Sequence, residues 1–153
     1  MDDTDRKILA ELQKDGRLSV TELGERIGLS LSPCHRRVRA LEQAGVISGY
    51  RAMIDPTTVG LNFSAIVFAT LREASRDRVE AFEAALPLIP EIIQAERLFG
   101  DPDYMLQVVT RDLGAFQQLY DERLSALPWV LRLTSTLVMK RILQNRPLPI
   151  AIE

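Results

Sequence analysis

The sequence contains only one cysteine and one histidine, and it has no long apolar run. A single cysteine excludes a framework of internal disulfides, since each such bond needs two thiols. The apolar runs are shorter than the roughly 18 residues of a membrane-spanning helix. The start Met1-Asp2-Asp3 also lacks the basic and then apolar pattern of a secretion signal. We therefore expect a cytoplasmic protein.

The residue sets of common enzymes are missing as well. The single histidine, His35, directly follows the single cysteine, Cys34, so no second residue of either type is present for a Cys/His metal site or a Ser/His/Asp set elsewhere. No glycine-rich phosphate loop occurs. We predict no catalytic residues, no metal and no cofactor. Cys34 is expected to be a small core residue rather than a nucleophile.

An excess of positive charge is also missing, because the formal net charge is −2. Residues 1–55 contain nine Lys/Arg and nine Asp/Glu, whereas residues 56–153 contain ten and twelve. Between residues 32 and 43, however, three arginines accompany one glutamate. Nucleic-acid binding needs a local basic patch and not a uniformly basic protein. The basic charge of this chain is concentrated in that short segment.

That segment lies in residues 30–44, which are predicted to form a helix. Ser30 is a suitable N-cap, Pro33 falls in the first turn, and Gly45 can end the helix in a left-handed conformation. One face is apolar and is formed by Cys34, Val38 and Leu41. The other face carries polar and basic residues that can enter a DNA major groove: Ser32, His35, Arg36 and Arg39. Taken alone, an ordinary amphipathic helix with a solvated polar face is the simpler interpretation.

The segments before this helix change that interpretation. Residues 3–14 have a helical apolar pattern, and Ser19-Val20-Thr21-Glu22 is a capping box that opens a second, short helix ending at Gly28. Two short helices joined by a tight turn, with a third helix upstream, form a helix-turn-helix domain, whose second paired helix reads DNA. The sequence thus predicts a DNA-binding domain over residues 1–45, with helix 30–44 as the reading helix.

The rest of the chain predicts a hinge and a second domain. Residues 46–54 alternate and are followed by Asp55-Pro56 and Gly60, so residues 46–61 are predicted to form a wing-like, strand-containing hinge. Further strands are predicted at 63–71, 92–99, 104–110 and 130–142, and helices after Ser75 and Asp112. This βαββαβ order is ferredoxin-like and covers residues 62–142, before a tail at 143–153. The predicted fold class is α+β: an N-terminal (winged) helix-turn-helix domain followed by a ferredoxin-like domain.

Two helices cover only one face of such a sheet. The strands contain more apolar residues than can fit beneath them, among which are Ile66, Phe68, Leu106, Val108, Leu133 and Leu137. An uncovered apolar face of this size usually marks a subunit interface. We therefore expect a homo-oligomer.

Several motifs of the chain resemble those of the Lrp/AsnC, or feast/famine, family of transcriptional regulators. In the N-terminal part they are Asp5-Arg6-Lys7-Ile8-Leu9, Leu12-Gln13-Lys14-Asp15-Gly16-Arg17, Gly28-Leu29-Ser30, Arg37-Val38-Arg39-Ala40-Leu41-Glu42 and Gly45-Val46-Ile47-Ser48-Gly49-Tyr50. In the C-terminal part they are Pro90-Glu91-Ile92, Gly100-Asp101-Pro102-Asp103-Tyr104 and Leu127-Pro128. The resemblance implies a DNA-binding domain, a strand-containing hinge and an effector-binding, oligomerising domain. It also implies dimers that commonly assemble into octamers and respond to amino acids or related metabolites.

With double-stranded DNA as the implied partner, the residues expected to contact it are Ser32, His35, Arg36, Arg37 and Arg39. Arg36 and Arg39 can each donate two hydrogen bonds to guanine, and Ser32 can bond a phosphate. For His35 the alternative is an ordinary exposed histidine. Arg37 flanks the apolar stripe, which favours a phosphate contact or an internal ion pair over base reading. A two-fold dimer predicts half-sites ~10 base pairs apart or a multiple of that spacing.

The resemblance also implies effector-binding residues, which are Gly100, Asp101, Asp103, Tyr104, Thr134, Ser135 and Thr136. A carboxylate suits an α-ammonium group, and backbone N–H groups near Gly100 suit an α-carboxylate. Without the resemblance, the same loop would be a plain β-turn. The chain departs from the family at Leu133 and Ser135, where Thr-x-Thr is usual. It departs again at Pro102 and Trp129, where an aromatic residue and a glycine are common, so the side-chain pocket is expected to differ.

Other functions fit the same architecture. One is an enzyme subunit similar to siroheme decarboxylases, which are thought to use histidines, whereas this chain has only His35. Another is an architectural DNA binder without an effector. A third, an amino-acid sensor that does not bind DNA, is disfavoured by the complete helix-turn-helix. A DNA-binding regulator that responds to an amino acid is the function we predict.

Overall fold

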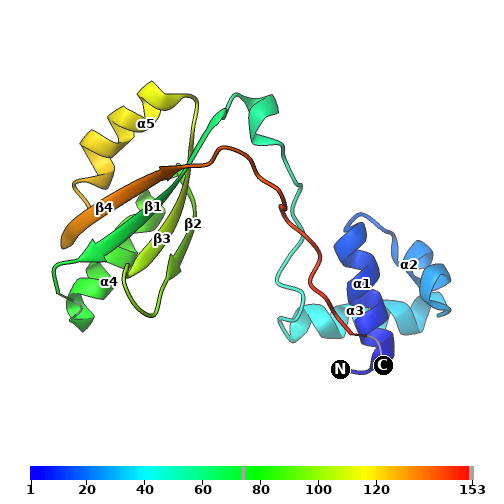
Figure 1. Cartoon of the computed structure of the whole chain (residues 1–153). Coiled ribbons are helices and arrows are strands. Elements are labelled where there is room, and N and C mark those ends of the chain that lie inside the picture. Colours follow the sequence, from blue (N-terminus) through cyan, green and yellow to red (C-terminus); the bar gives the residue numbers. More distant parts are fainter. Residues whose placement is uncertain (74, 152–153) are drawn as a thin grey trace. The chain divides into compact units, whose positions relative to one another are not determined.

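The computed structural model describes residues 1–73 and 75–151, which divide into two compact units (Figure 1). Unit 1 contains residues 1–53 together with the C-terminal segment that starts at Ile142, and unit 2 contains residues 54–141. The chain therefore passes from unit 1 into unit 2 and back again. Within the described residues, no helix is long and apolar enough to cross a membrane.

Unit 1 is built from three helices: α1 (Asp3–Lys14), α2 (Val20–Ile27) and α3 (Leu31–Gln43). A capping box starts each of the first two, through the pairs Asp2 with Asp5 and Ser19 with Glu22. Gly28 and Gly45 follow α2 and α3 with φ of +74° and +70°, the left-handed conformation that glycine adopts without strain. The three predicted helices are confirmed.

The helices of unit 1 enclose one apolar core. Its buried members are Ile8, Leu9, Leu23, Cys34, Val38 and Leu41. Burial raises the pKa of the Cys34 thiol, which disfavours the nucleophilic thiolate. The predicted role of Cys34 as a core residue is confirmed.

Ser30 and Ser75 occupy the N-cap positions of α3 and of the later helix α4 (Arg76–Ala85), but their hydroxyls accept no bond from a described first-turn N–H. For Ser30 the reason is local, because the third residue of α3 is Pro33, which has no N–H to donate. Nothing in the structure explains the same observation at Ser75. The carboxylate of Asp112, in contrast, accepts a bond of 2.7 Å from the Ala115 N–H and caps its helix as predicted.

Residues 46–54 correct one prediction, because all of them are described and none lies in a strand. A strand needs neighbouring backbone with which to pair. The N–H groups of Val46 and Ile47 donate instead to the carbonyl of Leu41 at the end of α3, at 3.0 and 3.2 Å. The hinge is therefore irregular chain followed by a 3₁₀ turn at Pro56–Val59.

Unit 2 is a four-stranded antiparallel sheet in the order β2-β3-β1-β4, with two helices. Its elements are β1 (Phe63–Leu71), α4 (Arg76–Ala85), β2 (Ile92–Arg97), β3 (Tyr104–Thr110), α5 (Leu113–Leu119), a π-helical turn (Tyr120–Leu124) and β4 (Val130–Leu137). The predicted ferredoxin-like arrangement is confirmed. Strands β2 and β4 end at 97 and 137 instead of the predicted 99 and 142. One further backbone bond follows each strand end: the Leu98 N–H donates to the Asp103 carbonyl at 2.7 Å, and the Val138 N–H donates to the Ser64 carbonyl at 2.9 Å.

The sheet has a helix-covered face and an open face. Alternate residues of β1 are buried beneath α4 and α5, namely Ala65, Val67, Ala69 and Leu71. Between them, Ile66 and Phe68 are half-buried and lie on the open face. Residues paired directly across an antiparallel sheet point to the same face. The register of β1 therefore assigns a face to each residue of β3 and β4 that is paired with it.

That register divides the six apolar strand residues named in the sequence analysis between the two faces. Leu106 and Val108 are fully buried, because they pair with residues of β1 on the helix-covered face. Leu133 also packs against this core, whereas Leu137 is exposed. Ile66 and Phe68 lie on the open face, so the prediction that not all six fit beneath the helices is confirmed.

Candidate DNA-binding and effector sites

The outer face of α3 presents the polar residues expected to read DNA. Helix α3 is held against α1 and α2 by its buried stripe, so the residues of the opposite side are exposed: Ser32, His35, Arg36 and Arg39. The Arg39 guanidinium lies 3.9 Å from the carboxylate of Glu42, and both side chains are solvated. Arg36 makes no ion pair with a described residue. The hydrogen-bond donors of this face can therefore reach a DNA groove without any rearrangement of the unit 1 core.

Arg37 is placed differently from its neighbours. Its Nη1 atom lies 2.8 Å from Asp2 and 2.7 Å from Asp5, so its guanidinium joins α3 to the start of α1. The backbone N–H of Asp5 and the Arg37 guanidinium lower the pKa of Asp2, and the two carboxylates raise the pKa of Arg37. Two roles were predicted for Arg37, a phosphate contact or an internal ion pair, and the structure shows the ion pair.

The loop between β2 and β3 carries the other predicted site. Asp101 is exposed, and its carboxylate accepts a bond from the Thr70 hydroxyl at 3.2 Å and pairs with Arg132 at 3.3 Å. Asp103 instead fixes the loop to β1, because its carboxylate accepts a bond of 2.7 Å from the Leu71 N–H. Its own N–H donates to the Ala69 carbonyl at 3.0 Å. Asp101 is therefore available to a ligand, while the Asp103 carboxylate has a structural partner.

Tyr104 lies on the helix-covered face and is buried. Its ring centroid lies 4.6 Å from that of Phe82, and its hydroxyl donates to Glu83 at 2.8 Å. Burial, and then the neighbouring Glu83 carboxylate, raise the pKa of Tyr104 to about 12. The structure therefore separates Tyr104 from Asp101, although the two residues are close in the predicted motif.

The three hydroxyl residues of β4 are also divided between the faces. Thr134 and Thr136 pair with Phe68 and Ile66 and share the open face with them, whereas Ser135 pairs with Val67 of the other face. Strand periodicity explains this division, because successive side chains alternate. The seven residues predicted from the resemblance thus do not form one cluster in this chain.

A hollow of about 190 Å³ lies on the open face, beside the β2–β3 loop. It is lined by Phe68, Thr70, Pro102, Arg132 and Thr134. Only Thr134 of these was among the predicted binding residues. Arg132 is detectable in the sequence, since it stands two residues before Thr134 on the same strand face. Its pairing with Asp101 across 31 positions of sequence requires the fold.

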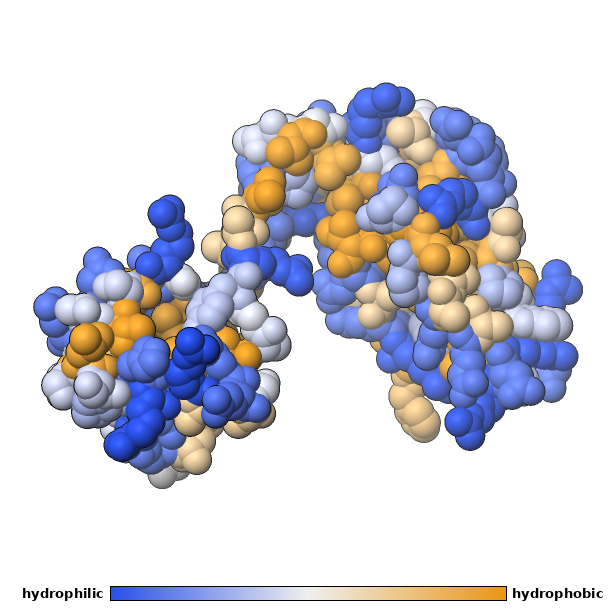
Figure 2. Space-filling view, turned by 180° about the vertical axis from the view of Figure 1, so that it is seen from behind, coloured by the Kyte–Doolittle hydropathy of each residue, from blue (hydrophilic) through white to orange (hydrophobic). Residues whose placement is uncertain are grey.

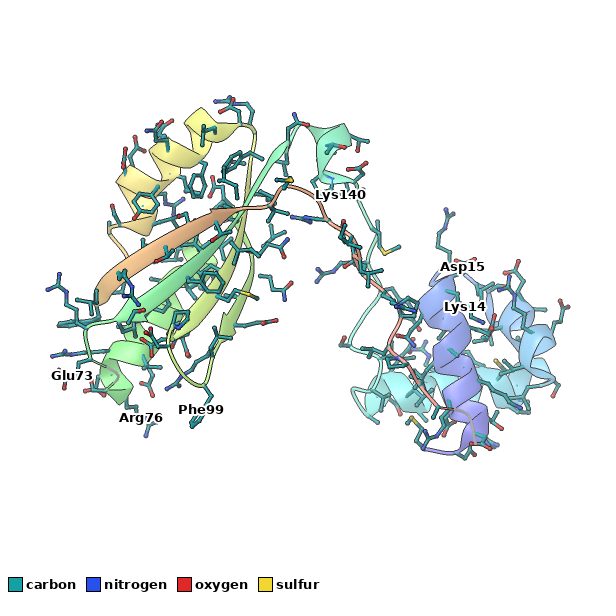
Figure 3. All side chains as sticks on the ribbon, viewed as in Figure 1. Lys14, Asp15, Glu73, Arg76, Phe99 and Lys140 are labelled. Carbon is teal, nitrogen blue, oxygen red and sulfur yellow. The ribbon has the colours of Figure 1, made fainter. Side chains whose placement is uncertain are left out.

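Phe99 marks the tip of the same loop. Its side chain is fully exposed and points away from the sheet (Figure 3). Among the described residues, no group of three or more His, Cys, Asp or Glu side chains is arranged to hold a metal ion.

Two family models match the chain. One, described as winged helix-turn-helix DNA-binding, matches residues 1–48, and the other, described as the Lrp/AsnC ligand binding domain, matches residues 64–148. The chain is 39% identical over 148 residues to the proline dehydrogenase transcriptional activator of Rhodobacter capsulatus, covering 96% of each protein. It is 40% identical over 150 residues to the leucine-responsive regulatory protein of Salmonella typhimurium, covering 98% of this chain and 92% of that protein.

Solved structures are similar over nearly the whole chain. A transcriptional regulator of Neisseria meningitidis in complex with L-methionine superposes with a TM-score of 0.92 at 38% identity, covering 97% of this chain and 96% of that one. The AsnC family transcriptional regulator of Agrobacterium tumefaciens gives 0.91 at 33% identity, with 97% of each chain covered.

Proposed function

We propose, because the chain belongs to the Lrp/AsnC family of transcriptional regulators, that it binds operator DNA as a homo-oligomer whose assembly and DNA affinity change when an amino acid binds unit 2. Unit 1 supplies the helix-turn-helix and unit 2 the ligand-binding domain. The observation that carries the proposal is the hollow beside Asp101 and Arg132, because it offers one carboxylate and one guanidinium to a zwitterion. Since the partner is DNA, the proposed location is the cytoplasm.

For DNA reading, the proposal assigns base contacts to Arg36 and Arg39 and backbone contacts to Ser32. These side chains are exposed on α3, and an arginine can bind guanine through two hydrogen bonds. His35 lies on the same face and can donate to a phosphate or base edge. Arg37 acts indirectly, since its ion pairs hold α3 against α1 and so set the angle of the reading helix.

For the effector, the proposal assigns the α-carboxylate to Arg132 and the α-ammonium group to Asp101. The two groups are 3.3 Å apart, so a ligand must separate them and replace their mutual pairing. Phe68 and Pro102 supply an apolar wall for the side chain, which favours an apolar amino acid. The similar structure that contains L-methionine supports this class of ligand.

For assembly, the proposal uses the open face of the sheet as a subunit interface. Ile66 and Phe68 lie there, and Phe99 projects from the adjoining loop. Figure 2, which views the molecule from behind, shows further hydrophobic residues at the surface of unit 2 among hydrophilic ones. Dimers assembling further into octamers are the expected form.

Substituting Arg for Ile66 should reduce the mass measured by light scattering. Substituting Arg for the exposed Leu88 is the matched control and should leave that mass unchanged.

The enzyme alternative has no observation in its favour. Cys34 is buried, and His35 lies on the outer face of α3, so neither residue lines the hollow of unit 2. We therefore propose a regulator rather than an enzyme.

The test is a thermal-shift screen of the twenty amino acids on the full chain. A ligand that binds only the folded protein raises its stability by ~2.7 kcal/mol at 100 times its dissociation constant. An apolar amino acid should raise the midpoint of wild type and of Arg76→Gln, a solvated control on α4, but not that of Arg132→Gln. The same amino acid should change operator affinity at fixed salt. If none of the twenty changes either quantity, the chain is an architectural DNA binder instead.

A further inference from the structure

The C-terminal segment from Ile142 belongs to unit 1, where it runs along α1 (Figure 1). The side-chain amide of Gln13 pairs with the backbone of Leu148 in both directions. The Leu148 N–H donates to Gln13 Oε1 at 2.6 Å, and Gln13 Nε2 donates to the Leu148 carbonyl at 3.3 Å. One α1 side chain thus satisfies a backbone donor and acceptor of the same residue, as a neighbouring strand would.

Two further contacts lie beyond this pair. Ile150 packs against the apolar core of unit 1, and Arg6 Nη1 donates to the Ala151 carbonyl at 2.9 Å. Gln13 and Arg6 lie two turns apart on α1, so the segment crosses the helix surface in the opposite direction. The Leu148 side chain is 72% exposed and takes no part. The recognition therefore depends on the backbone around Leu148 and on one apolar side chain, that of Ile150.

We propose that α1 carries a docking surface for residues 148–151 of its own chain, and that the docked segment is a second tether on the helix-turn-helix. The contacts above identify the segment that occupies this surface. Gln13 pairs with the Leu148 backbone, Arg6 donates to the Ala151 carbonyl, and Ile150 packs against the unit 1 core. Residues 138–147 alone separate this surface from β4, whereas residues 48–62 separate Ile47 in the unit 1 core from β1. The tail is thus the shorter of the two connections, and it starts from the strand that carries Arg132.

The experiment compares Leu148→Pro with Leu148→Ala in the full chain. Proline removes the N–H that Gln13 accepts, and the segment Pro147-Leu148-Pro149 already favours extended backbone. Alanine keeps that N–H and removes only the exposed side chain, so it is the matched control. Ile150→Asp tests the apolar contact separately. Amide exchange measured by mass spectrometry reports protection of α1.

In Leu148→Pro and Ile150→Asp, α1 amides should exchange about 3- to 10-fold faster, as expected for the loss of about one hydrogen bond or one apolar contact. Leu148→Ala should match wild type, and protection should not change on dilution. Equal exchange in wild type and Leu148→Pro overturns the docking surface. Protection that falls on dilution overturns docking within one chain and indicates the tail of a second copy. Unchanged exchange in unit 2 verifies that each variant has folded.

A second measurement rests on the proposed function. If the tether restrains the reading helix, Leu148→Pro should weaken operator binding about 3- to 10-fold with an unchanged salt slope, since no phosphate contact is lost. An unchanged operator affinity overturns the tether. Whether the tail docks on α1 is then decided by the amide-exchange result alone. A wild-type chain that binds no DNA overturns the proposed function instead, and amide exchange still decides whether the tail docks.

Discussion

The Tyr104 hydroxyl gives unit 2 a contribution to stability that should disappear at alkaline pH. Tyr104 is buried against Phe82, and its hydroxyl donates to the partly exposed Glu83 carboxylate. Ionising the phenol would bury a negative charge, remove the donated bond and place two anions side by side. Replacing Tyr104 with Phe removes the titration while keeping the ring.

The sign and size follow from the pKa. The pKa of Tyr104 is about 12 in the folded chain against an ordinary 10.0, so below pH 10 the phenol is neutral in both states. Between these values the unfolded chain releases the proton and the folded chain retains it, so stability falls as the pH rises. Two pKa units correspond to about 2–3 kcal/mol, all of it lost once the pH exceeds the folded value.

The assay is chemical unfolding of unit 2 in wild type and Tyr104→Phe across this pH window. At neutral pH the variant should be less stable by ~1 kcal/mol, because Glu83 loses one hydrogen bond and water can replace it. Near pH 12 the variant should be the more stable of the two, because only wild type loses the stability that the neutral Tyr104 phenol contributes. Titration of lysines is common to both chains and cancels. Parallel curves of unfolding free energy against pH for the two proteins would refute this account of Tyr104. If the variant no longer responded to the amino acid, Tyr104 would again be a candidate effector-binding residue.

Three further predictions concern single groups. Arg36→Ala should cost ~1–3 kcal/mol of operator affinity without changing unfolding, and a gel-shift assay combined with thermal melting checks both. Because the folded pKa of Asp2 lies below 3.8, unit 1 should lose stability as the pH falls through that region, and Arg37→Met should flatten this acid limb in circular dichroism melts. Trp129 has a φ of +63°, and the Arg78 guanidinium lies 4.3 Å from its ring. Trp129→Gly should therefore be more stable than Trp129→Ala by ~0.5–1 kcal/mol in urea unfolding, because left-handed backbone costs a non-glycine residue ~1–2 kcal/mol. Equal stabilities of the two variants would contradict that strain.

Local signals explain how much of the fold could be predicted. Capping boxes, glycine stops and apolar periodicity act within one turn or strand, so α1, α2 and the strand order could be inferred without coordinates. The hinge could not, because a strand at 46–54 depends on a partner that the residues themselves do not identify. The C-terminal tail could not either, since its pairing joins Gln13 to Leu148, which are far apart in sequence.

The candidate effector site was harder to predict than the fold. The motif Gly100-Asp101-Pro102-Asp103-Tyr104 places its polar residues close together in sequence, yet the register directs Tyr104 to the helix-covered face. The motif therefore locates the loop but not the ligand contacts. Phe68 and Arg132 join the hollow only because β1 lies between β3 and β4.

The distribution of charge on α3 connects DNA binding with assembly. Three arginines make this segment basic in sequence, but Asp2 and Asp5 at the start of α1 pair with Arg37, which leaves Arg36 and Arg39 exposed on the outer face of α3. Each neutralised phosphate contributes ~0.9 to the salt slope, so these two arginines would add less than about 2 even if both contacted phosphates instead of bases. Such a contact is weak alone, and linked heads gain affinity by acting at a high effective concentration. An amino acid that changes the proposed assembly would then change DNA affinity without touching α3. An Ile66→Arg variant that remains monomeric yet binds the operator as tightly as wild type would refute this connection.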